Sequence, residues 1–472
     1  MRTLLAALAL CFAFVGTHAG ATPSPASQRP NILFIVADDL ATRLGCYGDA
    51  AAITPNLDRL AREGVIFNRA YCQGVVCTPS RTSFMLGLNN RHAARNHFLR
   101  HPDTVTLGRW MREHGYQTYS IGKIDHRENF VDPKAWDIRV AGADAGSSPE
   151  TEAKVGRRLR LDEDLGPQKR RVADVGLTEK PEALKDWATT ERTLRFLDKE
   201  RDPKKPFFAA VGFHTPHHPN DTTQAAWESH DSAMFKLEKT PKDATPLPPG
   251  ALGQEPGLAV SETRQREAMR GYYAAVTMLD EQIGRLLEHL RVKGWIENTV
   301  VVFTSDHGYH LGWRGQWCKH SLSEQVLRVP LIVRHPQGAK GRKANGIVEL
   351  LDLFPTFCDI AGIPAPKALD GRSFLPLVKD PSVPGKPGAF CQDAGSRTLR
   401  TVRWRYTERS DGSAELYDHA TDGGEYYNVI ANLDHVAVVK QLRVQMEAEL
   451  GPRPQAASSK AEPSATSGPP PA

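Results

Sequence analysis

Residues 31–39 read Asn-Ile-Leu-Phe-Ile-Val-Ala-Asp-Asp, an unbroken apolar run that ends in two carboxylates. A run of this length without alternation predicts a strand that is buried on both faces, as in a parallel sheet covered by helices. Residues 207–213, 299–304 and 329–333 have the same character. The four runs therefore predict one large, mostly parallel sheet.

Helical patterns lie between these runs. Residues 55–63, 187–197 and 267–290 carry apolar side chains at helical spacing, and Thr54 and Pro55 occupy positions typical of an N-cap and a first-turn proline. Strands that alternate with helices are typical of an α/β fold. In such folds the ligand site lies beyond the carboxyl ends of the strands, so we expect the functional side chains at those ends.

The pattern changes beyond about residue 385, where short strand-like pieces and turns precede a helical stretch at 436–450. We predict a catalytic domain at residues 30–380 and a smaller α+β subdomain at 385–450. The last residues, 451–472, are rich in Pro, Ala and Ser, which predicts a disordered tail.

The first 19 residues have the pattern of a signal peptide: a short positive start, an apolar run, and small residues at a cleavage position. The apolar run is too short for a membrane anchor. We therefore expect the protein to be secreted or periplasmic. Of seven cysteines, Cys11 would leave with the signal, and the other six fit no known disulfide framework. Pairing and burial as small apolar residues both stay open for them.

Composition excludes several classes of protein. The 472 residues include 60 Lys and Arg against 55 Asp and Glu, and 40% are hydrophobic, which is typical of a soluble globular protein rather than a fibrous or disordered one. Residues 154–171 are strongly basic; a solvated insertion and a loop that attracts a polyanion are both open readings. The sequence contains no nucleic-acid-binding motif, so we predict no nucleic-acid partner.

Charged side chains follow two of the predicted strands. Asp38 and Asp39 end the first, and Asp306 and His307 follow the run at 299–304. Because parallel strands end at one edge of a sheet, these four groups could converge on one divalent ion. Mostly oxygen ligands favour Ca²⁺ or Mg²⁺ over zinc.

Residues 77–81, Cys-Thr-Pro-Ser-Arg, resemble the signature of the type I sulfatases, in which the cysteine is converted to formylglycine. The similarity covers nearly all of residues 30–450. The other stretches that agree with the family in order and spacing are Asp38-Asp39, Gly122-Lys123, His214, the segment that ends in Asp306-His307-Gly308, and Trp317-Cys318-Lys319.

Within that family the chain looks like the iduronate-2-sulfatase branch. Asp306-His307 stands where many sulfatases have Asp-Asn, and His126 follows Lys123 by three residues, as in that branch. Cys318, Tyr309 and the basic stretch at 154–171 depart from the pattern. The departures leave the chemistry intact and the sugar specificity open.

The resemblance implies an alkaline-phosphatase-like sulfatase fold, with one Ca²⁺ and a formylglycine made from Cys77. It implies that the hydrated aldehyde supplies the hydroxyl that attacks sulfur. The metal ligands would be Asp38, Asp39, Cys77 in its converted form, Asp306 and His307.

The resemblance also implies roles for the cationic residues. Arg81 would stabilise the aldehyde hydrate and the carboxylates on the metal side. Lys123 and Lys319 would hold sulfate oxygens, and either Lys319 or His214 would protonate the leaving alkoxide. His126 is the candidate base for the second hydroxyl of the hydrate.

The activity expected from this resemblance is an exported, calcium-dependent sulfatase that removes the 2-O-sulfate of a uronic acid residue from glycosaminoglycan fragments. Its partners would be the sulfated glycan and a formylglycine-generating maturation enzyme. Three alternatives stay open: a sulfatase for another glycan, aryl or choline sulfate; a phosphate or phosphonate ester hydrolase of the same superfamily; and a sulfoglycan-binding protein in which Cys77 is never converted.

Overall fold

The structure is a computed structural model that describes residues 29–90, 92, 104–125, 132–140, 157–160, 174–252 and 261–452. Four features predicted from the sequence lie outside the described residues: the signal peptide at 1–19, His126, the tail beyond residue 452, and the basic stretch at 154–171 apart from 157–160. Every helix in the described part of the chain is too short or too polar to cross a membrane.

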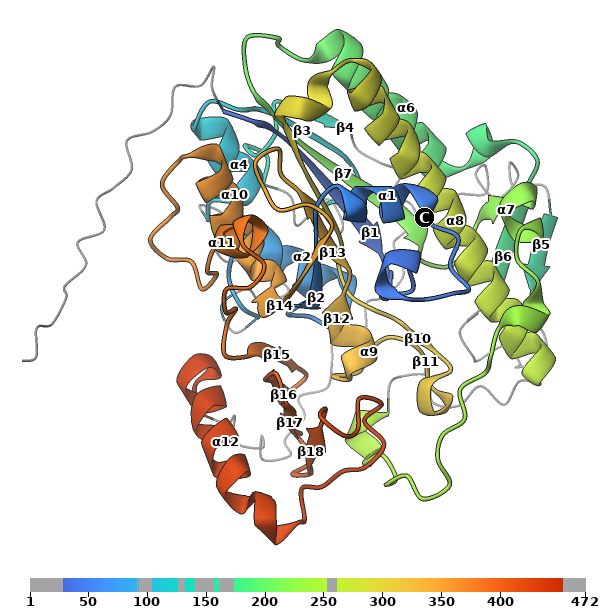
Figure 1. Ribbon diagram of the computed structural model, residues 1–472, viewed down its shortest axis with the longest axis vertical. Coiled ribbons are helices and arrows are strands. Elements are labelled where there is room, and N and C mark those ends of the chain that lie inside the picture. Colours follow the sequence, from blue (N-terminus) through green and yellow to red (C-terminus); the bar gives the residue numbers. More distant parts are fainter. Residues whose placement is uncertain are drawn as a thin grey trace, which may run out of the picture.

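A nine-stranded sheet lies at the centre of the described residues (Figure 1). The first strand, β1, pairs in parallel with β7 on one side and β9 on the other, and β3 continues the parallel part beyond β7. In spatial order the strands are β12 (Arg328–Val329), β2 (Val65–Tyr71), β13 (Leu331–Arg334), β9 (Thr299–Ser305), β1 (Asn31–Asp38), β7 (Phe207–Pro216), β3 (Gln117–Gly122) and β4 (Ile138–Val140), while β14 (Arg342–Glu349) pairs with β2.

Both faces of the sheet are covered by helices, which explains the unbroken apolar run of β1 (Figure 1). On one face, Phe34 packs edge-on against Phe84 and Phe357, with ring centroids 5.8 and 5.2 Å apart. On the other face, Ile35 lies in a second core with Tyr272. The first face carries α2 (Cys77–Leu86), α4 (Leu107–Glu113), α10 (Leu353–Ala361) and α11 (Leu375–Lys379); the second carries α1 (Pro55–Arg62), α6 (Lys185–Arg195) and α8 (Glu262–Val292).

The run at 329–333 is not the single strand that the sequence predicts. Pro330 separates β12 from β13, and both pieces run antiparallel to β2. The break follows from proline chemistry, because the ring leaves no N–H for the hydrogen-bond ladder. The sheet is therefore parallel around β1 and mixed at its β2 side.

Thr54 does not cap α1 in the expected way. It occupies the N-cap position, but its hydroxyl donates to Asp58, 3.2 Å away. The first-turn N–H groups of Asn56 and Leu57 instead donate to the carboxylate of Asp280 in α8, at 3.1 and 2.7 Å. A helix 224 residues away thus replaces the local cap and joins α1 to α8.

The C-terminal part forms a separate layer, at the bottom of Figure 1. Four antiparallel strands pack against one helix, α12 (Val436–Leu450), whose Leu442 and Met446 share a core with Leu399 and Tyr406 of the sheet. The strands are β15 (Ala389–Asp393), β16 (Ser396–Arg400), β17 (Trp404–Glu408) and β18 (Ala414–Asp418). The range predicted for the final helix, 436–450, coincides with α12.

Three smaller groups of elements surround the large sheet. One small sheet is formed by β5 (Arg157–Arg160), β6 (Asp174–Thr178) and β8 (Thr222–Thr223), and a two-stranded ribbon by β10 (His310–Leu311) and β11 (Trp317–Cys318). The short helices α7 (Gln224–Glu228) and α9 (Glu324–Leu327) follow β8 and β11. The six cysteines of the described residues are all free, and five of them are buried.

Candidate active site

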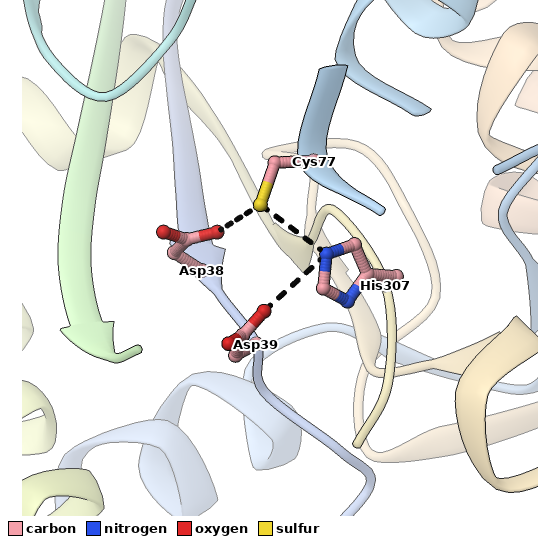
Figure 2. Close-up of side chains that lie close together, drawn as sticks. All are labelled: Asp38, Asp39, Cys77 and His307. Atoms are coloured by element: carbon pink, nitrogen blue, oxygen red, sulfur yellow. Dashed lines mark hydrogen bonds and ion pairs between the residues drawn. The ribbon is translucent and has the colours of Figure 1, made fainter. Parts of the chain in front are cut away.

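Two neighbouring strands and one helix bring the predicted residues to the same edge of the sheet. Asp38 ends β1, and Ala37 pairs with Ser305, so Asp306 and His307 follow β9 at the same level. Cys77 is the first residue of α2 and points toward both strand ends (Figure 2). The chain thus places groups from three distant segments around one buried point.

Asp38, Asp39, Cys77 and His307 each offer an atom to a cluster in which all four atoms lie within 4.8 Å of one another (Figure 2). The Cys77 sulfur is 3.3 Å from Oδ1 of Asp38 and 3.5 Å from Nε2 of His307. Nε2 of His307 lies 3.3 Å from Oδ1 of Asp39. All four side chains are buried, so the cluster is shielded from bulk water.

The cluster fits a divalent cation. Oδ2 of Asp39 is buried without a hydrogen-bond partner, which is costly unless another positive group meets it. Burial would raise the pKa values of Asp38 and Asp39, but Lys123 holds the pKa of Asp38 well below its ordinary value and Lys319 does the same for Asp39. The two ionised carboxylates are suitable ligands for a hard cation, whereas the imidazole nitrogen is a softer donor than such an ion prefers.

Asp306, the fifth residue predicted to hold the metal, lies beside this four-residue cluster and orients its neighbours. Its Oδ1 accepts the N–H groups of Asp39 and His307, at 3.2 and 2.9 Å. Its Oδ2 accepts Nε of Arg81 at 2.9 Å. Arg81, in turn, lies 3.4 Å from Oδ1 of Asp38, so one guanidinium links the carboxylates that follow β1 and β9.

Cys77 is a poor nucleophile as a thiol. Burial, and then the charge of Asp38, raise its pKa far above the ordinary value, so the sulfur keeps its proton. Since the thiolate is the reactive form of cysteine, the site does not activate an unmodified thiol.

Two lysines lie close to the sulfur of Cys77. Lys123, directly after β3, forms an ion pair with Asp38, and its Nζ is 3.8 Å from the Cys77 sulfur. Lys319 Nζ is 2.5 Å from Oδ1 of Asp39 and 3.2 Å from the same sulfur. Burial would lower the pKa of each lysine, but Asp38 and Asp39, respectively, raise it above the ordinary value. The amino groups of both lysines are therefore protonated at neutral pH.

The position of Lys123 depends on a close approach between β3 and β7. Its N–H donates to the carbonyl of Gly212 at 2.9 Å. A Cβ on Gly212 would lie 2.2 Å from the carbonyl carbon of Lys123, a distance that real side chains do not reach. Only glycine permits this spacing.

The end of β7 and the turn after it bring two histidines to the site, His214 within the strand and His217 directly after it. Asp186 of α6 accepts the N–H groups of His214 and Thr215, both at 2.9 Å, and so fixes the backbone there. The His214 and His217 rings are 5.0 Å apart, and Nε2 of His217 lies 3.9 Å from the unpaired Oδ2 of Asp39. His217 thus reaches the acidic cluster, although the sequence argument placed only His214 in the catalytic set.

Both imidazoles are neutral at neutral pH. Burial, followed by repulsion from Lys123, holds the pKa of His214 well below its ordinary value, and burial lowers the pKa of His217 to about 3. Nδ1 of His217 lies 2.6 Å from the carbonyl of His218, which can only accept, so that nitrogen carries the hydrogen. The lone pair of the His217 ring is therefore on Nε2, the atom that faces Asp39.

The charges of the site balance before any ion is added. Three carboxyl side chains meet three cationic ones, namely Asp38, Asp39 and Asp306 against Arg81, Lys123 and Lys319. A bound divalent cation would leave a net positive charge on this buried group of side chains. Such a site attracts an anion and stabilises negative charge that develops on it.

Comparison with known proteins agrees with this arrangement. Residues 30–363 match the family model named Sulfatase. Iduronate 2-sulfatase of Mus musculus is 30% identical over 424 residues, which cover 76% of this chain and 74% of that protein.

Two solved structures share the fold. One is of a protein in complex with its substrate D-glucosamine-2-N,6-O-disulfate (TM-score 0.74, 22% identity, 89% of this chain and 98% of that one). The other is the phosphonate monoester hydrolase of Agrobacterium radiobacter (TM-score 0.72, 20% identity, 89% and 95%). They confirm the fold class predicted from the sequence. Because the family model spans most of the chain, the protein belongs to the sulfatase family of sulfuric ester hydrolases.

Proposed function

We propose that this sulfatase removes the 2-O-sulfate of a uronic acid residue from glycosaminoglycan fragments. The observation that carries the proposal is the pair of protonated lysines, Lys123 and Lys319, with their Nζ atoms 3.8 and 3.2 Å from the Cys77 sulfur beside an acidic cluster. Membership of the sulfatase family supports the reaction class. The 30% identity to an iduronate 2-sulfatase supports the choice of sugar position.

The proposal includes two groups that the chain itself must acquire. Formylglycine made from Cys77 by a maturation enzyme would supply a hydroxyl nucleophile, and Ca²⁺ would polarise the ester oxygens. Asp38, Asp39, His307 and residue 77 would hold the ion, and Asp306 would support them through Arg81 and the backbone.

The cationic side chains bind the sulfate group and supply a proton. Lys123 and Lys319, both close to residue 77, would hold sulfate oxygens through charge-assisted hydrogen bonds. The leaving alkoxide needs a proton donor, and Lys319 keeps its proton at neutral pH whereas His214 does not. We therefore assign the donor role to Lys319.

Proton acceptance has two candidates. His126, chosen from the sequence, lies outside the described residues and stays a prediction. His217 presents the lone pair of Nε2 toward the acidic cluster, so it is placed to accept a proton from a hydroxyl bound there.

A phosphonate or phosphate ester hydrolase is the second candidate function. The observation that favours it is the fold likeness to a phosphonate monoester hydrolase, since cationic groups that hold a sulfate can also hold a phosphonate. The Cys-Thr-Pro-Ser-Arg motif at 77–81 favours the sulfate ester instead.

The test is hydrolysis by matured protein of disaccharides that carry one sulfate each, at uronate 2-O, glucosamine 6-O, galactosamine 4-O or galactosamine 6-O. An aryl sulfate, choline sulfate and a phosphonate monoester complete the series, with Cys77→Ala as the control. Preferential release from the 2-O-sulfated uronate supports the proposal. Faster turnover of another sulfate assigns a different substrate, phosphonate turnover alone favours the second candidate, and tight binding without turnover favours a sulfoglycan-binding protein.

We also propose export to the periplasm or the medium, on the basis of the signal-peptide pattern in residues 1–19. Cell fractionation and N-terminal sequencing test it. A protein that retains Met1 in the cytoplasmic fraction would contradict this part of the proposal.

A further inference from the structure

The segment that carries Lys319 has a strained backbone. It runs from β11 to α9, and the residues on both sides of Lys319 have left-handed backbone angles, with φ of +65° at Cys318 and +70° at His320. Residues with a Cβ adopt this region only where the surrounding structure holds them there. The backbone on both sides of Lys319 is therefore held by contacts of this segment, which include the pairing of Cys318 with His310, the N–H of His320 on the carbonyl of Val75 at 3.4 Å, and contacts nearer α9.

Arg405 of β17, in the C-terminal sheet, makes several of these contacts. Its guanidinium donates to the carbonyl of Leu322 at 3.0 Å and to Oε2 of Glu324 at 2.6 Å. Its Nε donates to the carboxylate of Glu425. Arg405 is only 1% exposed, so all three bonds are shielded from water. One side chain of the C-terminal subdomain thus binds the segment at Leu322 and Glu324, three and five residues after Lys319.

Two neighbours complete this contact. The backbone N–H of Glu324 donates to Oε2 of Glu425 at 3.0 Å, and Nε of Arg400 donates to Oε2 of Glu324 at 2.9 Å. The two carboxylates are thereby balanced by two guanidinium groups. The whole network lies between the catalytic domain and the C-terminal sheet.

A ligand does not account for these residues. Acceptor atoms of Glu324, His419 and Glu425 lie within 4.8 Å of one another, as in some metal sites. However, Arg405 and Arg400 already neutralise both carboxylates, and His419 Nε2 lies 2.9 Å from Glu425. The cavity that borders Arg405 and Glu425 has a volume of about 10 Å³, which is room for one water at most. The network joins the segment at 322–324 to Arg400, Arg405 and Glu425 rather than binding a ligand.

We propose that Arg405 is a positioning residue, which acts through Leu322 and Glu324 to keep Lys319 beside residue 77. The inference rests on the proposed function, because it is the role of Lys319 in turnover that makes its position matter. It makes the C-terminal subdomain a working part of the active site, although Arg405 itself contacts neither Cys77 nor the acidic cluster in the hydrogen bonds described above.

Arg397 offers a matched control in the same sheet. It lies on the neighbouring strand β16, is 2% exposed, and forms an equally buried pair with Glu408, 2.9 Å from Nε. Its guanidinium also donates to the carbonyl of Gly451, directly after α12, at 2.8 Å and lies 3.8 Å from the carboxylate of Glu447 in α12. Removal of this guanidinium disturbs the subdomain at the α12 side rather than at the Lys319 segment.

The experiment compares Arg405→Met, Arg405→Lys and Arg397→Met in the full-length protein. The readouts are kcat and KM, normalised to the formylglycine content measured by mass spectrometry, the melting temperature, and hydrogen exchange of the peptide that covers residues 317–323. For Arg405→Met we expect kcat to fall about 10- to 100-fold with a much smaller change in KM, because a small displacement of a catalytic group is costly. Exchange of the peptide should be faster than in the wild type.

The two other variants distinguish a specific effect on the Lys319 segment from a general loss of stability. Arg405→Lys keeps the charge but lacks the planar fork of five donors that reaches Leu322, Glu324 and Glu425 in the wild type, so its kcat should lie between those of Arg405→Met and the wild type. It also provides the test if Arg405→Met does not fold. Arg397→Met should lower the melting temperature while normalised kcat and exchange at 317–323 stay at the wild-type level.

Unchanged kcat and exchange in both Arg405 variants would overturn the proposal, and so would an equal loss of kcat in Arg397→Met, which would reveal general destabilisation. If the wild type hydrolyses no sulfate ester, the proposed function fails. The exchange comparison still decides whether Arg405 holds the Lys319 segment, because it needs no turnover.

Discussion

The Nζ atom of Lys319 lies 3.2 Å from the sulfur of Cys77, although 242 positions separate the two residues along the chain. Asp39, at 2.5 Å, keeps the ammonium group in place. A cation this close to the predicted nucleophile can contact both the sulfate group and the leaving oxygen of an ester bound at residue 77. The assignment of Lys319 as proton donor follows from this contact and gives the first prediction.

Lys319→Met should lower kcat by about 10²- to 10⁴-fold, the usual contribution of a general acid, with a smaller effect on KM. The raised pKa of Lys319, caused by Asp39 against the effect of burial, means that the wild type holds the proton throughout the neutral range. Steady-state kinetics on the best sulfate ester provide the measurement, with Lys319→Arg as the variant that keeps the charge. A rise in KM alone would assign Lys319 to ground-state binding instead.

Cys77→Ala and Cys77→Ser should both abolish sulfate release without unfolding the protein. Burial and Asp38 keep the Cys77 thiol protonated, so neither sulfur nor an ordinary hydroxyl at this position is activated. Sulfate release and the melting temperature are measured side by side, and mass spectrometry of the wild-type peptide reports conversion of the cysteine. Wild-type rates in Cys77→Ser would refute nucleophilic catalysis by a converted residue 77.

Chelation with EDTA should remove activity and lower the melting temperature, and added Ca²⁺ should restore both. A cation that binds the folded state alone stabilises it by mass action. The unpaired Oδ2 of Asp39 is the atom that a bound cation would stabilise most, because it has no hydrogen-bond partner. Asp39→Asn should therefore lose the calcium-dependent shift in melting temperature, whereas Asp280→Asn, in α8, should keep it. Full activity in EDTA would contradict a metal-dependent site.

Acid should weaken the contact that Glu425 makes between Arg405 of the C-terminal sheet and the backbone of Glu324. Burial would raise its pKa, but Arg405 lowers it from 4.5 to about 2 in the folded protein. A depressed pKa contributes stability that is fully present above pH 4.5 and is lost as the pH falls toward 2. The melting temperature of Glu425→Gln should accordingly fall less than that of the wild type over this range. Glu297→Gln, a change at an 80% exposed side chain, should follow the wild-type profile; identical profiles for all three proteins would refute the prediction.

Asp280→Ala should destabilise the fold and leave normalised kcat unchanged. The substitution removes the acceptor for two first-turn N–H groups of α1, those of Asn56 and Leu57, which costs about 1–3 kcal/mol when such donors are left unpaired. Denaturant unfolding measures the loss. Asp198→Ala removes a surface carboxylate that pairs with His289 and Lys293, and should cost less than 1 kcal/mol or so. Equal losses in the two variants would contradict the capping role.

Local sequence was sufficient to predict the elements that are decided by burial. The unbroken run at 31–37 could be assigned to a central strand because helices cover both faces, and the helix at 436–450 because its apolar residues recur at helical spacing. The direction of β13 could not be predicted. Strand direction depends on how the chain returns to the sheet, and the apolar run at 329–333 is the same whether it pairs in parallel or antiparallel.

In the candidate site, too, some residues could be predicted from local sequence and others could not. The strand-end rule led to Asp38, Asp39, Asp306 and His307, since it concerns only where strands stop. It could not choose between His214 and His217, because their rings lie on a turn whose path is set by Asp186 of α6. Partners such as Asp280 and Arg405 leave no local signal at all; their role exists only once distant segments meet.

The contact between Gly212 and Lys123 has a consequence for attempts to redesign this enzyme. The backbones of β3 and β7 lie so close together at Gly212 and Lys123 that a Cβ on Gly212 would force the two strand ends apart. Variants that replace Gly122 or Gly212 should displace Lys123, because a Cβ at either position would lie 2.0 or 2.2 Å from a backbone atom of the other strand end. Substitutions are better made at side chains farther from this contact, where a change in shape does not move the ammonium group of Lys123.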